Sequence, residues 1–174
     1  MRTHFLSAVL VLASLMTNRD LQSQDLNARI PGPTTMAQLS GPRFGATVMP
    51  RRTRAELASN GIRVGGAMSQ FGWQFERLFL SGDGQMAAVS EVVVLVGGLD
   101  QGTFLPSINW VIGARHIGGM EFGVGPNVSA SGAALVVAAG ATRRAGSMNI
   151  PVNLSIVPSK FGARVSVLTG FTVR

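Results

Sequence analysis

The chain has 174 residues, of which 46% are hydrophobic and only 13% are charged, against a usual charged share of about 25%. Basic residues outnumber acidic ones by 15 to 8, but they are scattered Arg with a single Lys, which does not favour a nucleic-acid-binding protein. The chain has 22 glycines and no cysteine, so its composition excludes a disulfide-stabilised fold, and the low charge argues against a disordered chain.

The N-terminus has the pattern of a secretory signal. A basic start precedes an apolar run of 12 residues, Phe5–Met16, which is too short to span a bilayer as a helix because that takes about 20 residues. We therefore expect residues 1–23 to be a signal peptide that is removed on export. Residues 24–42 are polar and contain several Pro and Gly, so they are predicted to form a flexible N-terminal arm.

One short helix is predicted near residues 53–60. Thr53-Arg54-Ala55-Glu56 matches a capping box, in which Thr53 caps the first turn and Glu56 reaches back to it. Asn60-Gly61 ends the helix, because this pair tolerates a left-handed conformation. Two turns are marginal in isolation, so we expect this helix to lie in a connection.

The rest of the chain is predicted to form β-strands separated by Gly-, Ser- and Asp-rich turns. The eight predicted strands are 43–49, 62–80, 85–96, 103–116, 120–128, 133–142, 148–157 and 163–173. A break is expected in the second strand at Gly65-Gly66. The segments 89–96 and 133–141 are apolar at nearly every position, which suggests strands hidden on both faces.

The other strands alternate residue by residue between apolar and polar side chains. In the second strand, for example, Trp73 and Phe75 lie on one face, while Gln74 and Glu76 lie on the other. The polar faces predict a polar network inside a barrel, formed by Gln74, Glu76, Asn109, Arg115, Glu121, Asn153 and Arg164. Since buried carboxylates need partners, we expect Glu76 and Glu121 to pair with Arg115 and Arg164. Glycines on the same faces would let a crowded interior close; they are Gly72, Gly113, Gly123, Gly125 and Gly170.

The predicted fold class is all-β: an antiparallel up-and-down meander over residues 43–174, closed into an eight-stranded barrel. Closure requires the strand 163–173 to pair with the strand 43–49. In a soluble barrel the apolar faces would point inward, whereas in a membrane barrel they would meet lipid. Strands of about 9 to 13 residues, together with a single Lys, favour the membrane barrel.

With its export signal, alternating strands, short turns and lack of Cys, the chain resembles the small outer-membrane β-barrels of Gram-negative bacteria over residues 43–174. The resemblance implies an outer-membrane location, contact with membrane lipid, and insertion by the outer-membrane assembly machinery. That machinery is thought to read aromatic residues near the C-terminus; Phe171 partly matches this, and the terminal residue is Arg174. The expected role is structural, adhesive or that of a narrow pore.

Two alternatives stay open at this point. One is a soluble exported barrel, periplasmic or secreted, that binds an apolar ligand. The other is a lipid-modifying enzyme, because some resembling barrels are lipid deacylases with a Ser/His/Glu set. Here His116 precedes Glu121 on the next strand, but position 118 is Gly118 where such enzymes tend to have Ser. Two of Glu76, Glu91 and Glu121 would suit acid/base catalysis if they were close together.

We expect no catalysis, no cofactor and no metal, because His116 is the only histidine outside the predicted signal peptide and a histidine cluster is therefore excluded. We also expect no nucleic-acid partner. The only basic cluster, formed by Arg51, Arg52 and Arg54, has no aromatic residues between its members, so it is expected to face solvent or anionic headgroups at a membrane edge.

Overall fold

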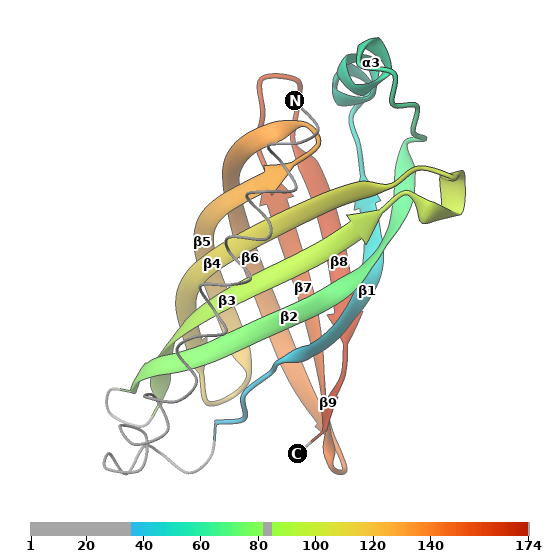
Figure 1. Ribbon diagram of the computed structural model, residues 1–174. Coiled ribbons are helices and arrows are strands. Elements are labelled where there is room, and N and C mark those ends of the chain that lie inside the picture. The colour runs from blue at the N-terminus through green and yellow to red at the C-terminus, as the bar shows by residue number, and fades with distance from the viewer. Residues whose placement is uncertain (1–35, 82–84, 174) are drawn as a thin grey trace, which may run out of the picture. The chain divides into compact units, whose positions relative to one another are not determined.

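The computed structural model of the protein describes residues 36–81 and 85–173. The predicted signal peptide, residues 1–23, and residues 24–35 of the predicted arm lie outside the described residues. The chain divides into two units, and the second, Thr35–Arg174, is a β-barrel that carries one α-helix (Figure 1). The strands are β1 Gly41–Val48, β2 Ala67–Ser81, β3 Met86–Gly97, β4 Leu105–His116, β5 Met120–Ser129, β6 Gly132–Ala145, β7 Met148–Val157, β8 Arg164–Gly170 and β9 Thr172–Val173. The helices are α3 Arg51–Ser59 and the 3₁₀-helix η1 Leu99–Gln101.

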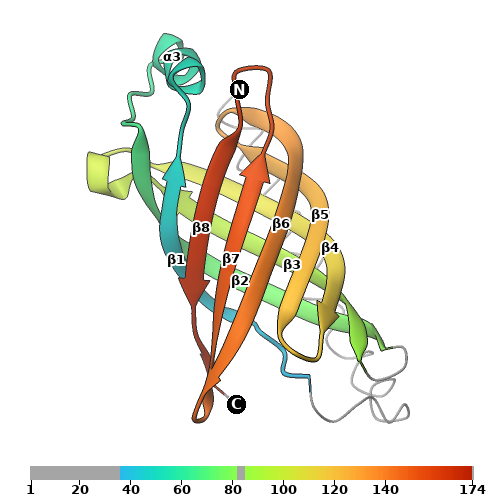
Figure 2. The ribbon, with the colours of Figure 1, turned by 180° about the vertical axis from the view of Figure 1, so that it is seen from behind.

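The barrel is closed by eight antiparallel strands, as predicted. Each of β1 to β7 pairs with the next strand along the chain, and β8 returns to β1 with Phe44 opposite Thr169. This pairing confirms the expected seal between the first and last long strands. The short β9 follows β8 and pairs with the start of β7, with Val173 opposite Met148. Figure 2 shows β8, β7 and β6 side by side on the wall opposite β2 and β3.

The two ends of the barrel carry different connections. At one end, which we call the α3 end, lie the segment 49–66 with α3, the segment 98–104 with η1, and the segment 158–163 (Figure 1). At the other end, the terminal end, lie the start of β1, the short β9, and tight turns such as His116–Met120. Gly119 has a φ of +88°, which only glycine adopts readily, and its N–H donates to His116 O at 2.8 Å.

The two faces of the strands have opposite chemistry. Large apolar side chains point outward and are about half exposed, as Phe75 at 50% and Trp110 at 46% show. Polar and charged side chains point inward and are buried, including Arg43, Thr47, Gln70, Gln74, Glu76, Arg115, Glu121 and Asn127. Apolar side chains fill the rest of the interior in small groups; one is Val93, Leu95 and Leu168, and another is Val111, Val136 and Val157. The alternation read from the sequence therefore places polar groups inside.

Helix α3 begins earlier than the capping box predicts. Its N-cap is Pro50, and no side chain caps the first turn, so the predicted cap at Thr53 is wrong. Thr53 Oγ1 instead donates to Phe161 O, 3.3 Å away in the β7–β8 connection. The Thr53 hydroxyl thus makes a tertiary hydrogen bond instead of capping the first turn of the helix. The predicted end of the helix is confirmed, because Asn60 is the C-cap and Gly61 has a φ of +79°.

Two strand predictions also need correction. Residues 62–66 are not part of β2, which starts at Ala67, so the expected break at Gly65-Gly66 is the start of the strand. Strand β6 is not hidden on both faces, because Leu135 and Val137 are exposed on its outer face while Val136 is buried. The segment 133–141 of β6 is apolar at nearly every position because its outer residues are apolar and its inner residues are small.

Glycines let neighbouring strands come close together. A Cβ at Gly72 would lie 1.9 Å from Val94 O, and one at Gly113 would lie 2.1 Å from Phe122 O. Both distances are far below any real contact, so these positions need glycine for steric reasons. The group that a Cβ would meet first is neighbouring backbone at four of the five predicted glycines, and at Gly123 it is the side chain of Val111.

Candidate functional site in the barrel interior

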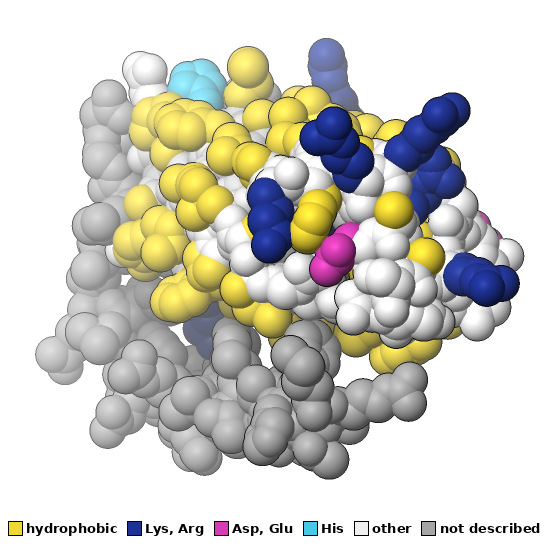
Figure 3. Space-filling view, turned by 90° about the horizontal axis from the view of Figure 1, so that it is seen from above, with side chains coloured by type: hydrophobic (Ala, Val, Ile, Leu, Met, Phe, Trp, Pro, Cys, Tyr) yellow, Lys and Arg dark blue, Asp and Glu magenta, His cyan; other side chains and the backbone are white. Residues whose placement is uncertain are grey.

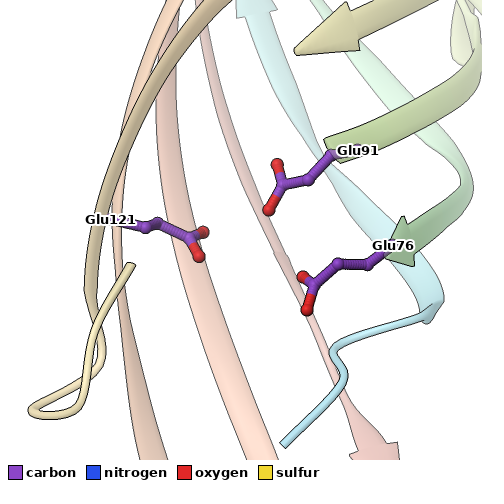
Figure 4. Close-up of side chains that lie close together, drawn as sticks. All are labelled: Glu76, Glu91 and Glu121. Atoms are coloured by element: carbon purple, nitrogen blue, oxygen red, sulfur yellow. The ribbon is translucent and has the colours of Figure 1, made fainter. Parts of the chain in front are cut away.

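Four charged side chains meet inside the barrel near the terminal end. They are Glu76 of β2, Glu91 of β3, Arg115 of β4 and Glu121 of β5, and we call them the Arg115 cluster. Figure 4 shows the three carboxylates converging from three different strands. Each residue occupies an inner-face position of its strand, where side chains alternate in direction. The side chains of the cluster are between 0% and 8% exposed.

Arg115 donates hydrogen bonds to all three carboxylates. Its Nη1 lies 2.6 Å from Glu76 Oε1, its Nε lies 2.6 Å from Glu121 Oε2, and its Nη2 lies 3.1 Å from Glu91 Oε1. Asn153 Nδ2 donates to the second oxygen of Glu121 over 2.5 Å. Charge-assisted bonds of this kind are about twice as strong as neutral ones. The cluster is a closed ion-pair network that joins four consecutive strands.

Residues before β1 reach into this cluster. Leu39, which is 2% exposed, donates its backbone N–H to Glu76 Oε1 at 3.0 Å. Its carbonyl oxygen accepts from Arg43 Nη2 at 2.6 Å, and Arg115 Nη1 donates to Ala37 O at 3.4 Å. The described part of the predicted arm is therefore bound at the terminal end of the barrel, and residues 41 and 42 already belong to β1.

The Arg115 cluster has oxygen atoms that could serve as ligands of a cation, but it has no free volume for the ion. Oxygen atoms of Glu76, Glu91 and Glu121 lie within 4.8 Å of one another, and such a set suits a divalent cation. Here the Arg115 guanidinium takes the central position and contacts all three. The free volume beside Glu91 and Glu121 is about 10 Å³, at the lower limit for one water. The carboxylates thus have no space for a substrate between them, as acid/base catalysis on a sugar would require.

A second polar region lies at the α3 end, around a cavity of about 40 Å³. We call it the Arg164 chamber and define it by Thr47, Gln70, Ser107, Asn109, Asn127, Ser129 and Arg164, which line the cavity together with Ser166 and several apolar side chains. Arg164 Nη1 donates to Ser129 Oγ at 2.9 Å, and Nη2 donates to Asn127 Oδ1 at 2.7 Å. On the inner face of β4, Val111 lies between Asn109 of the chamber and Arg115 of the cluster.

The residues predicted for the polar network fall into both regions. Glu76, Arg115 and Glu121 form the Arg115 cluster, and Gln74 and Asn153 lie beside it, with Gln74 Oε1 accepting from Arg43 Nε at 2.9 Å. Asn109 and Arg164 belong to the Arg164 chamber. The expected pairing of Arg164 with a carboxylate is wrong, because its hydrogen-bond acceptors are Ser129 and Asn127 at the other end of the barrel.

Sequence reasoning did not place Arg43 or Glu91 in the network. Glu91 stands in a run of valines that is apolar on both faces, so no alternation marks it as inward-facing. Arg43 does alternate with Phe44 in the sequence, and this alternation is the signal that identifies Arg43 as an inner residue. In the structure Phe44 is 48% exposed and Arg43 is buried.

The residues considered for lipid hydrolysis are not brought together. His116 is exposed at the end of β4, and its Nδ1 accepts from Gly118 N at 3.0 Å. Glu121 points into the barrel and is bound to Arg115 and Asn153. Because Arg115 faces inward, the next residue along the strand faces outward, so the barrel wall separates the imidazole from the carboxylate.

Comparisons of the chain with protein-family models, with curated proteins and with solved structures find no match. The closed eight-stranded barrel and its polar interior are thus the observations on which a function can be argued.

Proposed function

We propose that this chain is a small outer-membrane β-barrel protein with a closed interior, exported by its N-terminal residues 1–23 and serving a structural or adhesive role. One observation carries the proposal: the apolar faces of the strands point outward and the polar faces are buried. A barrel in water would gain nothing from such an arrangement, whereas a barrel in lipid needs it because hydrocarbon must contact apolar side chains. The outward apolar residues include Phe75, Trp110, Val152, Ile156 and Phe171.

The lengths of the strands and connections agree with this proposal. Strands β2 to β7 have 10 to 15 residues, and a tilted strand needs about 9 to 11 residues to cross a bilayer. Membrane barrels have short turns on the side that holds both termini and longer loops on the outer side. The terminal end and the α3 end differ in the same way, so we assign the α3 end to the outer surface.

Exposed charged side chains lie mainly at the barrel ends. Figure 3 looks down on the α3 end and shows several Lys and Arg side chains there, with hydrophobic side chains along the flank. Exposed Arg51, Arg52 and Arg63 belong to the connection that carries α3, and they are placed to meet anionic headgroups. Arg77 lies on the outer face of β2 near the terminal end, where a long side chain reaches the interface by extending along the barrel.

The interior supports a closed barrel more than a pore or a ligand carrier. The Arg115 cluster and the apolar groups beside it fill the lumen, as expected for eight strands. The larger of the two described cavities, about 40 Å³, is lined by both polar and apolar groups and is far below the roughly 300 Å³ at which small-molecule pockets begin. We therefore propose a protein without catalysis or transport, whose partners are membrane lipid and the outer-membrane assembly machinery.

Tryptophan quenching tests the membrane location. The chain without residues 1–23 is refolded in buffer and in lipid vesicles whose acyl chains carry bromine. Trp73 and Trp110, both 46% exposed on the outer face, should be quenched by the bromolipids and protected from aqueous acrylamide. Folding in buffer to the same β content, with acrylamide reaching both indoles, would contradict the proposal.

The variants Trp73→Phe and Trp110→Phe serve as controls, since each leaves one reporter on the outer face. The two single reporters come from different strands. They should nevertheless behave alike, because both indoles lie on the outer face of the barrel. Planar-bilayer recordings then test closure: we expect no steady conductance, and a reproducible open level would replace the structural role with that of a narrow pore.

A further inference from the structure

Arg164 is a half-buried cation whose hydrogen-bond partners are neutral. Its two acceptors are the hydroxyl of Ser129 and the amide oxygen of Asn127. In the described ranges 36–81 and 85–173, the interior ion pairs all belong to Arg115, and none includes Arg164. A guanidinium that is partly removed from water without a counter-charge loses hydration that neutral dipoles replace only in part.

The neutral groups around Arg164 present donors to the chamber. Thr47 Oγ1 donates to Gln70 Oε1 at 2.6 Å, so the amide oxygen of Gln70 is already used. Asn127 Nδ2 donates to Asn109 Oδ1 at 2.7 Å, which uses the oxygen of Asn109 in the same way. Both side chains line the cavity, and within the described part of the chain their NH₂ groups have no protein acceptor.

We propose that the Arg164 chamber binds a single halide ion, with chloride as the natural occupant. A cation and two amide donors around one cavity are the chemistry that holds an anion. The cavity of about 40 Å³ exceeds the roughly 10–15 Å³ that one water needs, so it admits a particle of that size class. This inference goes beyond the proposed function, since it depends on the interior alone and not on what surrounds the barrel.

The halide enters from the α3 end and goes no further. Ala130 and Ser131, exposed residues of the β5–β6 turn, line the same cavity and give it access to solvent at the α3 end. Toward the terminal end, Val111 closes the inner face of β4, and beyond it stand the three carboxylates around Arg115. Apolar packing and negative charge both oppose an anion there. The chamber is therefore a binding site that is closed toward the barrel interior, and it is not part of a channel.

Bromide provides a direct test with the unaltered protein, because it replaces chloride and scatters anomalously. Crystals of the protein soaked in sodium bromide should show an anomalous peak within hydrogen-bonding distance of the Arg164 guanidinium. Absence of a peak in the chamber, with bromide sites present elsewhere on the surface, would overturn the proposal.

Thermal unfolding in detergent gives a second readout. At constant ionic strength, replacing sodium gluconate by sodium chloride should raise Tm in a saturable way. At a chloride concentration 100 times Kd, the unfolding equilibrium constant should fall about 100-fold. Equal stability in gluconate and chloride would count against a halide site.

Three variants separate binding from general effects. Arg164→Gln should lose the chloride dependence. If it fails to fold, Asn109→Asp answers the question, because it places a fixed negative charge of nearly the same shape in the cavity that Arg164 also lines. Asn109→Asp should fold and be insensitive to chloride. Arg63→Gln, which removes an exposed charge at the same end, should keep the full dependence. A chloride response retained by Asn109→Asp would overturn the proposal.

Discussion

Arg115 and Glu76 form a two-pronged ion pair across a strand that lies between them. Nη1 of Arg115 donates to Oε1 of Glu76 at 2.6 Å and Nη2 donates to Oε2, although β3 separates β4 from β2 in the sheet. The two side chains are 4% and 0% exposed. The planar guanidinium matches the carboxylate in a way that a lysine ammonium does not. This pair, with Glu91 and Glu121 on the same guanidinium, ties the terminal half of the barrel together.

Removing this guanidinium should be the most damaging single change in the interior. Arg115→Leu leaves three buried carboxylates without their partner, and breaking a buried pair in this way costs about 3–5 kcal/mol of unfolding free energy. Urea unfolding in detergent, followed by tryptophan fluorescence, measures the loss. Arg143→Leu, a change at an exposed position of β6, is the matched control and should alter stability by less than about 0.5 kcal/mol. Similar losses in both variants would show that the cluster has no special role.

The close approach of β2 and β3 predicts a strict requirement for glycine at one position. In Gly72→Ala, the added Cβ would meet Val94 O at 1.9 Å, so the strands must separate, at a cost of about 1–3 kcal/mol. Gly66→Ala is the control, because a Cβ there has nothing within 4 Å. Equilibrium unfolding of the two variants should differ by that amount. A Gly72→Ala variant as stable as Gly66→Ala would mean that the strands are further apart than described.

The segment before β1 should contribute to stability even though it is not part of the sheet. Leu39→Ala removes a fully buried side chain at the terminal end, and such truncations cost about 2–5 kcal/mol. Leu99→Ala, at a position 46% exposed in η1, makes the same chemical change and should cost much less. Limited proteolysis adds a second measurement, since the Leu39 variant should be cut before β1 sooner than the parent protein. Equal cleavage rates would argue that the segment is not held.

Asp100 should titrate below the ordinary range of aspartate. Hydrogen bonds from the Ser69 hydroxyl, at 2.6 Å, and from the Ser69 backbone N–H, at 3.1 Å, hold the pKa of the Asp100 carboxyl below its usual value. Because the folded pKa is the lower one, this contact is fully present above the unfolded pKa, about 3.9, and is lost as the pH falls through the folded pKa. The Ser69 amide proton, followed by NMR, should report a midpoint below about 3.9. A midpoint at or above that value would show that the contact does not persist in solution.

Alternation along the strands was sufficient to predict the barrel and most of its inner face. In β2 the aromatic residues Trp73 and Phe75 mark the outside, so Gln74 and Glu76 follow as inside residues. The same rule fails for Glu91, since valines on both faces of β3 leave no period to detect.

The partners of inner residues are harder to predict than their direction. Which carboxylate reaches which arginine depends on height along the barrel axis, and the stagger between strands sets that height. Arg164 at the start of β8 and Glu121 at the start of β5 therefore lie at opposite ends, although both face inward. The start of α3 was missed for a related reason, because the Phe161 carbonyl that binds Thr53 is 108 residues away in sequence.

The hydrogen bond between Thr47 of β1 and Ser166 of β8 joins residues 119 positions apart, and its distance is 2.6 Å. It crosses the β1–β8 seam at which the barrel closes. The hydrogen bond from Arg164 of β8 to Asn127 of β5 spans the lumen instead. Adding one hairpin after another cannot form the contact across the seam, because it joins the first and the last of the eight strands. Such long-range pairing makes folding slow. An unclosed sheet therefore leaves Thr47 and Ser166 without their contact with each other, whereas the Arg115 cluster needs only the consecutive strands β2 to β5.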